Sequence, residues 1–122
     1  MVAIQRKDIL QPAVTNPLHP QLSCITAIVP SPDWFTGLDD LDLCQDGEWL
    51  DNARIEVSPM DAGTDNGLTF TSPNWATDPR GEVFAITSSF PDHPAASFNY
   101  RNLQKLPTIA TYSVKQVKIY FR

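Results

Sequence analysis

The chain has 122 residues, of which 42% are hydrophobic, and its 14 acidic and 9 basic residues give a formal net charge of −5. The length fits one small domain, because domains typically hold roughly 100–200 residues. The acidic balance argues against nucleic acid as a partner, because phosphate backbones require a basic surface. No apolar run approaches the roughly 20 residues that cross a bilayer, so we expect no membrane insertion. The N-terminal residues also lack the basic and apolar pattern of a signal peptide.

Proline marks the first part of the chain. Pro12, Pro17 and Pro20 interrupt residues 1–21, which show little hydrophobic periodicity. Proline cannot continue most regular elements. We therefore expect an irregular leader over residues 1–21 and a folded domain over residues 22–122.

Short segments of β-type composition follow the leader. Residues 24–29 are apolar and rich in β-branched side chains, and residues 53–57 alternate between apolar and polar ones. These patterns predict a buried strand and a half-buried strand. Asp46-Gly47 lies between two further such segments and is a strong hairpin signal.

Other segments complete an all-β pattern. Strand-like composition recurs at residues 41–44, 68–71, 82–87 and 109–121, whereas residues 30–40 and 72–79 have the composition of loops. A change of phase within residues 109–121 indicates either a bulge or a strand covered on both faces. No helical period of 3.6 residues is convincing. The predicted fold class is therefore all-β, an antiparallel β-sandwich.

The two cysteines, Cys24 and Cys44, permit one disulfide. Two buried free thiols are an equally open interpretation, since one pair does not fix the redox compartment. There is no Cys-x-x-Cys spacing and there are only two histidines. A structural zinc site of ordinary spacing is therefore not expected.

Three aspartates stand in turn-forming segments. Asp33 lies in Pro30-Ser-Pro-Asp-Trp34, and Asp61 and Asp65 bound Asp61-Ala-Gly-Thr-Asp65. Calcium takes roughly six to eight oxygen ligands, which loops supply from carboxylates and carbonyls. If the strand that ends before Asp33 neighbours the strand at residues 53–57, the exits of both strands meet at one end of the sandwich.

These aspartates have two other possible interpretations. An EF-hand loop over residues 61–72 fails, because Gly63 takes its third position and Ser72 its twelfth, where carboxylate ligands are needed. An aspartate beside glycine or proline also commonly accepts a hydrogen bond from its own backbone. The spacing alone leaves a metal site and a turn-forming role both open.

The other polar and aromatic residues give no catalytic set. His93, Asp92 and Ser97 suggest a hydrolase only weakly, because no Gly-x-Ser-x-Gly motif accompanies them. We therefore expect no enzymatic activity. Trp34, Trp49 and Trp75 could present a binding surface, although core and loop-anchoring roles come first in a small domain. The alternative function is a metal-independent structural or carbohydrate-binding β-sandwich, with binding at Trp34 or Trp75.

Many motifs together resemble the spondin domain of the F-spondin and mindin family. They run in order over residues 22–117 and are Pro30-Ser-Pro-Asp-Trp-Phe35, Gly37, Leu41-Asp-Leu-Cys44, Asp61-Ala-Gly-Thr-Asp65 with Gly67, Ser72-Pro-Asn74, Ile86-Thr-Ser-Ser89, His93-Pro-Ala95, Leu106-Pro107 and Ile109-Ala110. The resemblance implies a C2-like antiparallel β-sandwich in a secreted module of extracellular-matrix adhesion. It also implies a divalent cation, with calcium expected, on Asp33, Asp61 and Asp65.

The resemblance implies further features of this chain. The matched portion corresponds to roughly the second half of the module, so we expect a partial domain without its N-terminal strands. The family's cysteine at Cys44 usually pairs with an upstream cysteine that this chain lacks, and a Cys24–Cys44 bridge would be a substitute. The implied partner is an extracellular protein or a glycan. An open sheet edge would also allow self-association.

Overall fold

The computed structural model describes residues 2–6 and 9–117, which form antiparallel β-strands and loops. The strands are β1 (Val2–Arg6), β2 (Ile9–Ala13), β3 (Gln21–Ala27), β4 (Trp34–Asp42), β5 (Cys44–Gln45), β6 (Glu48–Trp49), β7 (Asn52–Val57), β8 (Met60–Asp61), β9 (Phe84–Ala85) and β10 (Ala110–Gln116). No helix in this part of the chain is long and apolar enough to cross a membrane. The predicted all-β, antiparallel class is confirmed.

The chain divides into two compact units. Unit 1 comprises Met1–Cys24, Leu38–Val57 and Ala110–Arg122, and unit 2 comprises Ile25–Gly37 and Ser58–Ile109. Strands β3 and β4 contribute residues to both units.

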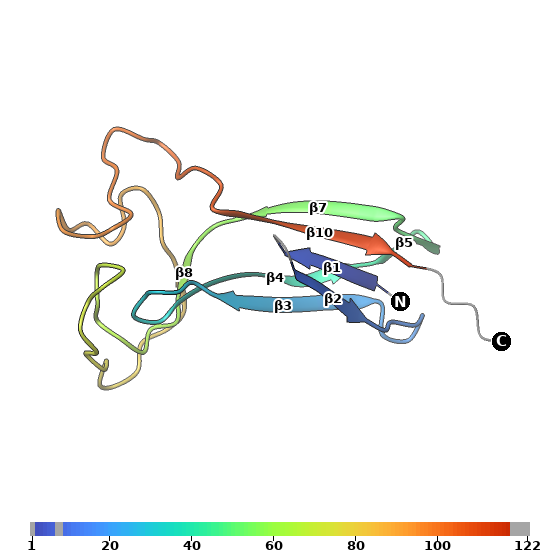
Figure 1. The fold of residues 1–122 in the computed structure, drawn as a ribbon, viewed down its shortest axis with the longest axis horizontal. Helices are drawn as coiled ribbons and strands as arrows, with labels where there is room; N and C mark the ends of the chain where they lie inside the picture. The colour runs from blue at the N-terminus through green and yellow to red at the C-terminus, as the bar shows by residue number, and fades with distance from the viewer. Residues whose placement is uncertain (1, 7–8, 118–122) are drawn as a thin grey trace. The chain divides into compact units, whose positions relative to one another are not determined.

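Unit 1 contains a four-stranded sheet in the order β2-β1-β10-β7, which Figure 1 shows as neighbouring strands. The pairing of β10 with β7 is unbroken from Ala110 opposite Val57 to Lys115 opposite Asn52. The bulge considered for this segment is therefore absent from β10. The rest of the predicted strand, residues 118–121, lies outside the described residues.

The core of unit 1 explains the sandwich. Leu22 of β3, Val57 of β7 and Tyr112 and Val114 of β10 are buried together with Leu43. Side chains from two sheets thus meet in one apolar layer, as in other β-sandwiches. Full burial of each such side chain stabilises the fold by roughly 1.5–3 kcal/mol.

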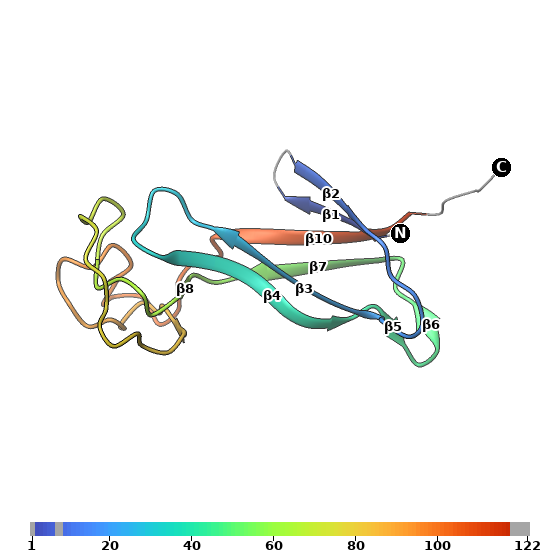
Figure 2. The same ribbon diagram turned by 90° about the horizontal axis from the view of Figure 1, so that it is seen from below.

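The predicted hairpin at Asp46-Gly47 is confirmed. Strand β5 pairs with β6 through Cys44 opposite Trp49 and Gln45 opposite Glu48, and Figure 2 shows the two strands side by side. Asp46 and Gly47 have φ values of 53° and 82°. A two-residue turn with positive φ at both positions matches the right-handed twist of the strands it joins.

Both cysteines lie in unit 1 as free thiols. Cys24 and Cys44 are each half-buried. Of the two open interpretations, the structure therefore agrees with the second, in which both cysteines are free thiols.

The structure differs from the expected irregular stretch over residues 1–21. Strands β1 and β2 pair with each other from Val2 opposite Ala13 to Arg6 opposite Ile9, and β1 also pairs with β10. Pro12 lies in β2, which is an edge strand of the sheet. An edge strand tolerates proline because one row of its backbone groups needs no ladder partner. The division into a leader and a partial domain remains a prediction.

Three other expected boundaries are wrong. Strand β4 begins at Trp34, inside residues 30–40, which were predicted as a loop. Residues 68–71 form no strand, because the Ser72 hydroxyl accepts hydrogen bonds from the backbone N–H groups of Leu68 and Thr69 and closes a turn. Such side-chain bonds compete with sheet pairing. In residues 82–87, only β9 is a strand.

Unit 2 contains short strands and long loops, and Figures 1 and 2 show β8 among these loops. Strand β8 pairs with both β4 and β9. The core of unit 2 contains Trp34, Ile86 and Leu106. The ring of Trp34 also lies 5.3 Å, between centroids, from each of Phe70 and Phe98. Trp34 is thus a core residue of this unit.

Candidate functional site: a cluster of three aspartates

Asp61 occupies the end of β8, where it lies opposite Trp34 of β4 and Phe84 of β9. Only 5% of the residue is exposed. Its Oδ1 accepts a hydrogen bond from the backbone N–H of Gly63 at 2.7 Å, and its Oδ2 accepts one from the indole N–H of Trp34 at 3.2 Å. The sheet therefore holds a buried carboxylate whose two oxygens both have a donor.

Asp65 repeats the same local geometry four residues later. Its Oδ1 accepts a hydrogen bond from the backbone N–H of Gly67 at 2.8 Å. Its Oδ2 accepts one from the backbone N–H of Trp75 at 3.0 Å, next to a β-bridge between Asp65 and Ala76. Asp-x-Gly thus occurs twice, and each time the carboxylate closes a turn with the glycine two residues on, as Asx turns do.

Asp33 lies in the loop between β3 and β4 and reaches the segment between the other two aspartates. Its Oδ2 accepts hydrogen bonds from the N–H and the hydroxyl of Thr64 at 2.7 and 2.9 Å and from the N–H of Asp65 at 3.0 Å. Its Oδ1 is buried and has no hydrogen-bond partner within the described residues. An unsatisfied buried oxygen of this kind is uncommon and calls for an explanation, such as a water or an ion.

The charges of the three carboxylates act on one another. Burial raises the pKa of the Asp61 carboxyl above its ordinary value of 3.8, and the negative charges of Asp33 and Asp65 raise it further. The hydrogen bonds from Gly63 and Trp34 act in the opposite direction. Like charges held together in a buried place favour the protonated form, and a bound cation would relieve this repulsion.

Two close backbone approaches fix the loop that carries Asp61 and Asp65. Gly63 has a φ of +72°, and a Cβ there would lie 2.6 Å from the backbone oxygen of Glu82. The N–H of Gly81 donates a hydrogen bond to the Gly63 carbonyl at 2.8 Å. A Cβ on Gly67 would lie 2.5 Å from Cγ of Pro32, in the loop of Asp33. Glycine is required at positions 63 and 67 because no side chain fits there.

The structure thus brings the three predicted residues together, although by a different route from the one considered. The route expected from the sequence required the strand before Asp33 to neighbour residues 53–57. Instead, β3 neighbours β4, and β7 neighbours β10. The aspartates meet because β4, which follows Asp33, pairs with β8, which ends in Asp61.

The donor set has the chemistry that calcium prefers, since all of its side-chain groups are oxygens. The buried, unpartnered Oδ1 of Asp33 fits such an ion. Each carboxylate nevertheless already accepts backbone hydrogen bonds. Within residues 2–6 and 9–117, no three His, Cys, Asp or Glu side chains are grouped so that they could hold a metal ion. Metal ligation by Asp33, Asp61 and Asp65 therefore remains a prediction.

Signals in the sequence are weaker for the residues that support the cluster. Thr64 donates two of the three hydrogen bonds to Asp33. Ser31 shapes the loop, because its hydroxyl donates to the Ile28 carbonyl at 2.6 Å and accepts from the Trp34 N–H at 3.1 Å. A serine three residues before the start of a strand could have indicated this turn, whereas nothing local indicated the partner of Thr64.

The three residues considered for a hydrolase have separate partners. Nδ1 of His93 accepts a hydrogen bond from the N–H of Ala95 at 3.1 Å. Asp92 forms an exposed ion pair with Arg101, and the hydroxyl of Ser97 accepts a hydrogen bond from the N–H of Phe70. These bonds shape turns and loops, and none of them joins two of the three residues.

Together these features describe an antiparallel β-sandwich domain whose loops gather buried carboxylates. The family model Spondin_N matches residues 6–108 of this chain. The chain therefore belongs to the Spondin_N family, which confirms the resemblance seen in its motifs.

Curated relatives agree with this assignment. The chain is 53% identical over 95 residues to Spondin-2 of Rattus norvegicus, which covers 78% of this chain and 29% of the relative. It is 50% identical over 100 residues to Spondin-2 of Homo sapiens, covering 82% and 30%. Spondin-1 of Gallus gallus is 42% identical over 78 residues, covering 63% and 10%. The chain thus spans about three tenths of the length of the Spondin-2 proteins it matches.

Proposed function

We propose that this chain is a non-enzymatic recognition module of the extracellular matrix and of cell adhesion, which binds a divalent cation, calcium, through Asp33, Asp61 and Asp65. Membership of the spondin family supports the adhesion role and a secreted, extracellular location. The cluster of three aspartates supports the cation. The observation that carries the metal proposal is the buried Oδ1 of Asp33, which lacks a partner beside two other carboxylates.

A calcium ion on these carboxylates would supply positive charge and a bridge between loops. Asp33 belongs to the loop before β4, whereas Asp61 and Asp65 bound the loop after β8. An ion shared by both loops would hold them together and offset the repulsion among the three charges. The ion would then add to the hydrogen bonds through which Asp33 already connects the two loops.

Thermal unfolding with and without calcium tests this proposal. A ligand that binds only the folded state stabilises it by about 2.7 kcal/mol at a concentration of 100 times its Kd. We therefore expect millimolar calcium to raise the Tm by several degrees and EDTA to reverse the change. Asp61→Ala should remove the effect, and Asp61→Asn should do so with less disturbance of the core.

The matched control is Asp92→Asn, because this exposed aspartate lies outside the cluster. It should leave the calcium effect intact. A wild-type Tm that does not move in millimolar calcium would refute the metal proposal.

A second candidate is a metal-independent structural or carbohydrate-binding sandwich in which the aspartates only shape turns. The Asx turns of Asp61 and Asp65 favour it, because both form without an ion. In this case, melts would be equal in calcium and in EDTA. Of the two tryptophans considered for carbohydrate binding, Trp34 is 4% exposed and Trp75 is 66% exposed. Only Trp75 is accessible to a ligand.

We propose an extracellular protein or a glycan as the partner, without nucleic-acid binding or membrane insertion. Self-association through an open sheet edge is a further part of this proposal. Strand β3 is an edge strand without charged residues, and its Ile25 is 76% exposed. Such an edge can accept another strand.

A further inference from the structure

A small cavity lies in unit 1, and none of its described lining residues belongs to the aspartate cluster. Its volume is about 240 Å³. Its described lining residues are Thr15, Pro17, Leu43, Trp49, Leu50, Asn52, Ala53, Val114 and Gln116. Two backbone hydrogen bonds of 2.9 Å fix its walls, from the N–H of Leu50 to the Leu43 carbonyl and from the N–H of Gln116 to the Asp51 carbonyl. The cavity is therefore built on paired backbone.

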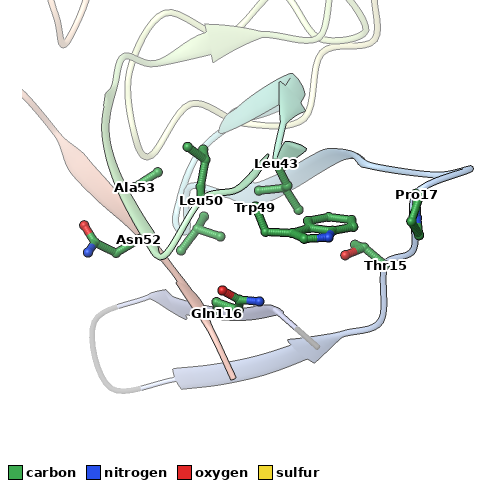
Figure 3. Close-up of a pocket in the computed structure, with 9 residues that line it drawn as sticks. Thr15, Pro17, Leu43, Trp49, Leu50, Asn52, Ala53 and Gln116 are labelled. Atoms are coloured by element: carbon green, nitrogen blue, oxygen red, sulfur yellow. The ribbon is translucent and has the colours of Figure 1, made fainter. Parts of the chain in front are cut away.

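The lining combines one aromatic ring with uncharged polar groups. Figure 3 shows the indole of Trp49 between Leu50 and Thr15, with the side-chain amide of Gln116 on another side of the cavity. Trp49 comes from β6, in the hairpin with β5, and Gln116 is the last residue of β10. None of the described lining residues is charged.

Several polar groups of this lining have no partner in the described part of the chain. These are the hydroxyl of Thr15, the side-chain amide of Gln116 and the indole N–H of Trp49. The hydroxyl and the amide can each donate and accept, and the indole donates. Polar groups placed around an apolar surface give a binding pocket its specificity.

From this arrangement we infer that the cavity binds one ring of a neutral saccharide. A pyranose has an apolar C–H face that stacks on an indole, and its hydroxyls both donate and accept hydrogen bonds. The aromatic face of Trp49 and the groups of Thr15 and Gln116 match these two properties. The binding site differs from the aspartate cluster, so saccharide binding should not depend on calcium.

The size and charge of the cavity narrow the ligand class. Pockets for drug-sized ligands begin at about 300 Å³, so a cavity of about 240 Å³ suits one ring. A phosphorylated or sulfated sugar would enter without a cationic partner among the described lining residues, on a chain of net charge −5. A neutral ring avoids the free-energy cost of placing an unpaired negative charge in the cavity.

Nuclear magnetic resonance of the tryptophan indole N–H groups tests the proposal on the full chain. The three tryptophans give three such signals, which Trp→Phe variants assign. We would titrate glucose, mannose, galactose and N-acetylglucosamine, in EDTA and again in calcium. A single ring should bind with a Kd in the millimolar range, and the Trp49 signal should move under both conditions while the Trp75 signal stays in place.

Variants make the test specific to this lining. Thr15→Val and Gln116→Met keep the size of each side chain but remove its hydrogen bonds, and each should weaken binding by roughly five- to tenfold. Trp49→Ala should abolish it. Trp75→Ala is the matched control, because its side chain is exposed and lies in unit 2.

Three results would overturn the inference. One is a Trp49 signal that no sugar moves at concentrations well above the millimolar range. Another is a shift confined to Trp75. The third is equal binding by wild type, Thr15→Val and Gln116→Met. Adenosine serves as a flat, neutral comparison: if adenosine moves the Trp49 signal and no sugar does, the saccharide assignment is wrong.

Discussion

Asp65 donates its backbone N–H to the carboxylate of Asp33 at 3.0 Å, across 32 positions of the sequence. Thr64 adds two more hydrogen bonds to the same oxygen. One carboxylate therefore connects the loop before β4 to the loop after β8. The structural role of Asp33 is independent of whether an ion also binds there.

Replacing Asp33 by alanine should destabilise the fold, because three donors of the Thr64–Asp65 segment lose their acceptor. Hydrogen bonds to a charged group contribute about 1.5–3 kcal/mol, so we expect a loss of that order in urea unfolding with EDTA present. Asp92→Ala is the comparison, since it removes only an exposed ion pair with Arg101, which is worth at most about 1 kcal/mol. Equal losses in the two variants would contradict the role of Asp33 as a connector.

Gly63 and Gly47 allow two destabilising effects of an added side chain to be measured separately: left-handed backbone strain and steric overlap with neighbouring atoms. Both have positive φ, but a Cβ at Gly47 meets nothing within 4 Å, whereas one at Gly63 lies 2.6 Å from the Glu82 backbone oxygen. Gly47→Ala should cost about 1–2 kcal/mol from left-handed strain alone.

Gly63→Ala should cost roughly 1–3 kcal/mol more, from steric overlap with backbone atoms. Denaturant unfolding of the two variants under the same conditions measures the difference. If Gly63→Ala were no less stable than Gly47→Ala, the close approach between Gly63 and Glu82 would be wrong.

The raised pKa of Asp61 predicts a pH dependence of stability in the absence of divalent cations. The folded chain holds this proton more tightly than the unfolded chain does. At pH values above 3.8 and up to the raised folded pKa, the folded state therefore binds more protons than the unfolded state. The free energy of unfolding contributed by Asp61 is therefore fully present below the unfolded pKa and is lost as pH rises through the raised folded value.

Urea unfolding in EDTA from mildly acidic to neutral pH should show this decline in the wild type and a flatter profile in Asp61→Asn. Calcium should act in the opposite sense, because ligation needs the deprotonated carboxylate, so its stabilising effect should grow with pH. Identical pH profiles for wild type and Asp61→Asn would show that Asp61 does not titrate in this way.

Much of the fold followed from local patterns. The alternation at residues 53–57 gave β7, and Asp46-Gly47 gave the β5–β6 hairpin, because both depend on neighbours in the sequence. Strands β1 and β2 were not predicted, because the prolines suggested an irregular chain, and only the strand order of the sheet shows that Pro12 lies in an edge strand. At residues 68–71 a strand was predicted but is absent, because the Ser72 hydroxyl accepts hydrogen bonds from backbone N–H groups that a strand would use.

The sequence by itself determined that this chain is an all-β member of the spondin family and that Asp61 and Asp65 bound a turn-forming segment. Those features rest on composition, motif order and contacts over a few residues. Only the tertiary structure decided how Asp33 reaches them, that its Oδ1 is buried without a described partner and that Trp49, Thr15 and Gln116 line one cavity. Each of these depends on which strands pair, and pairing joins residues whose separation in the sequence gives no local signal.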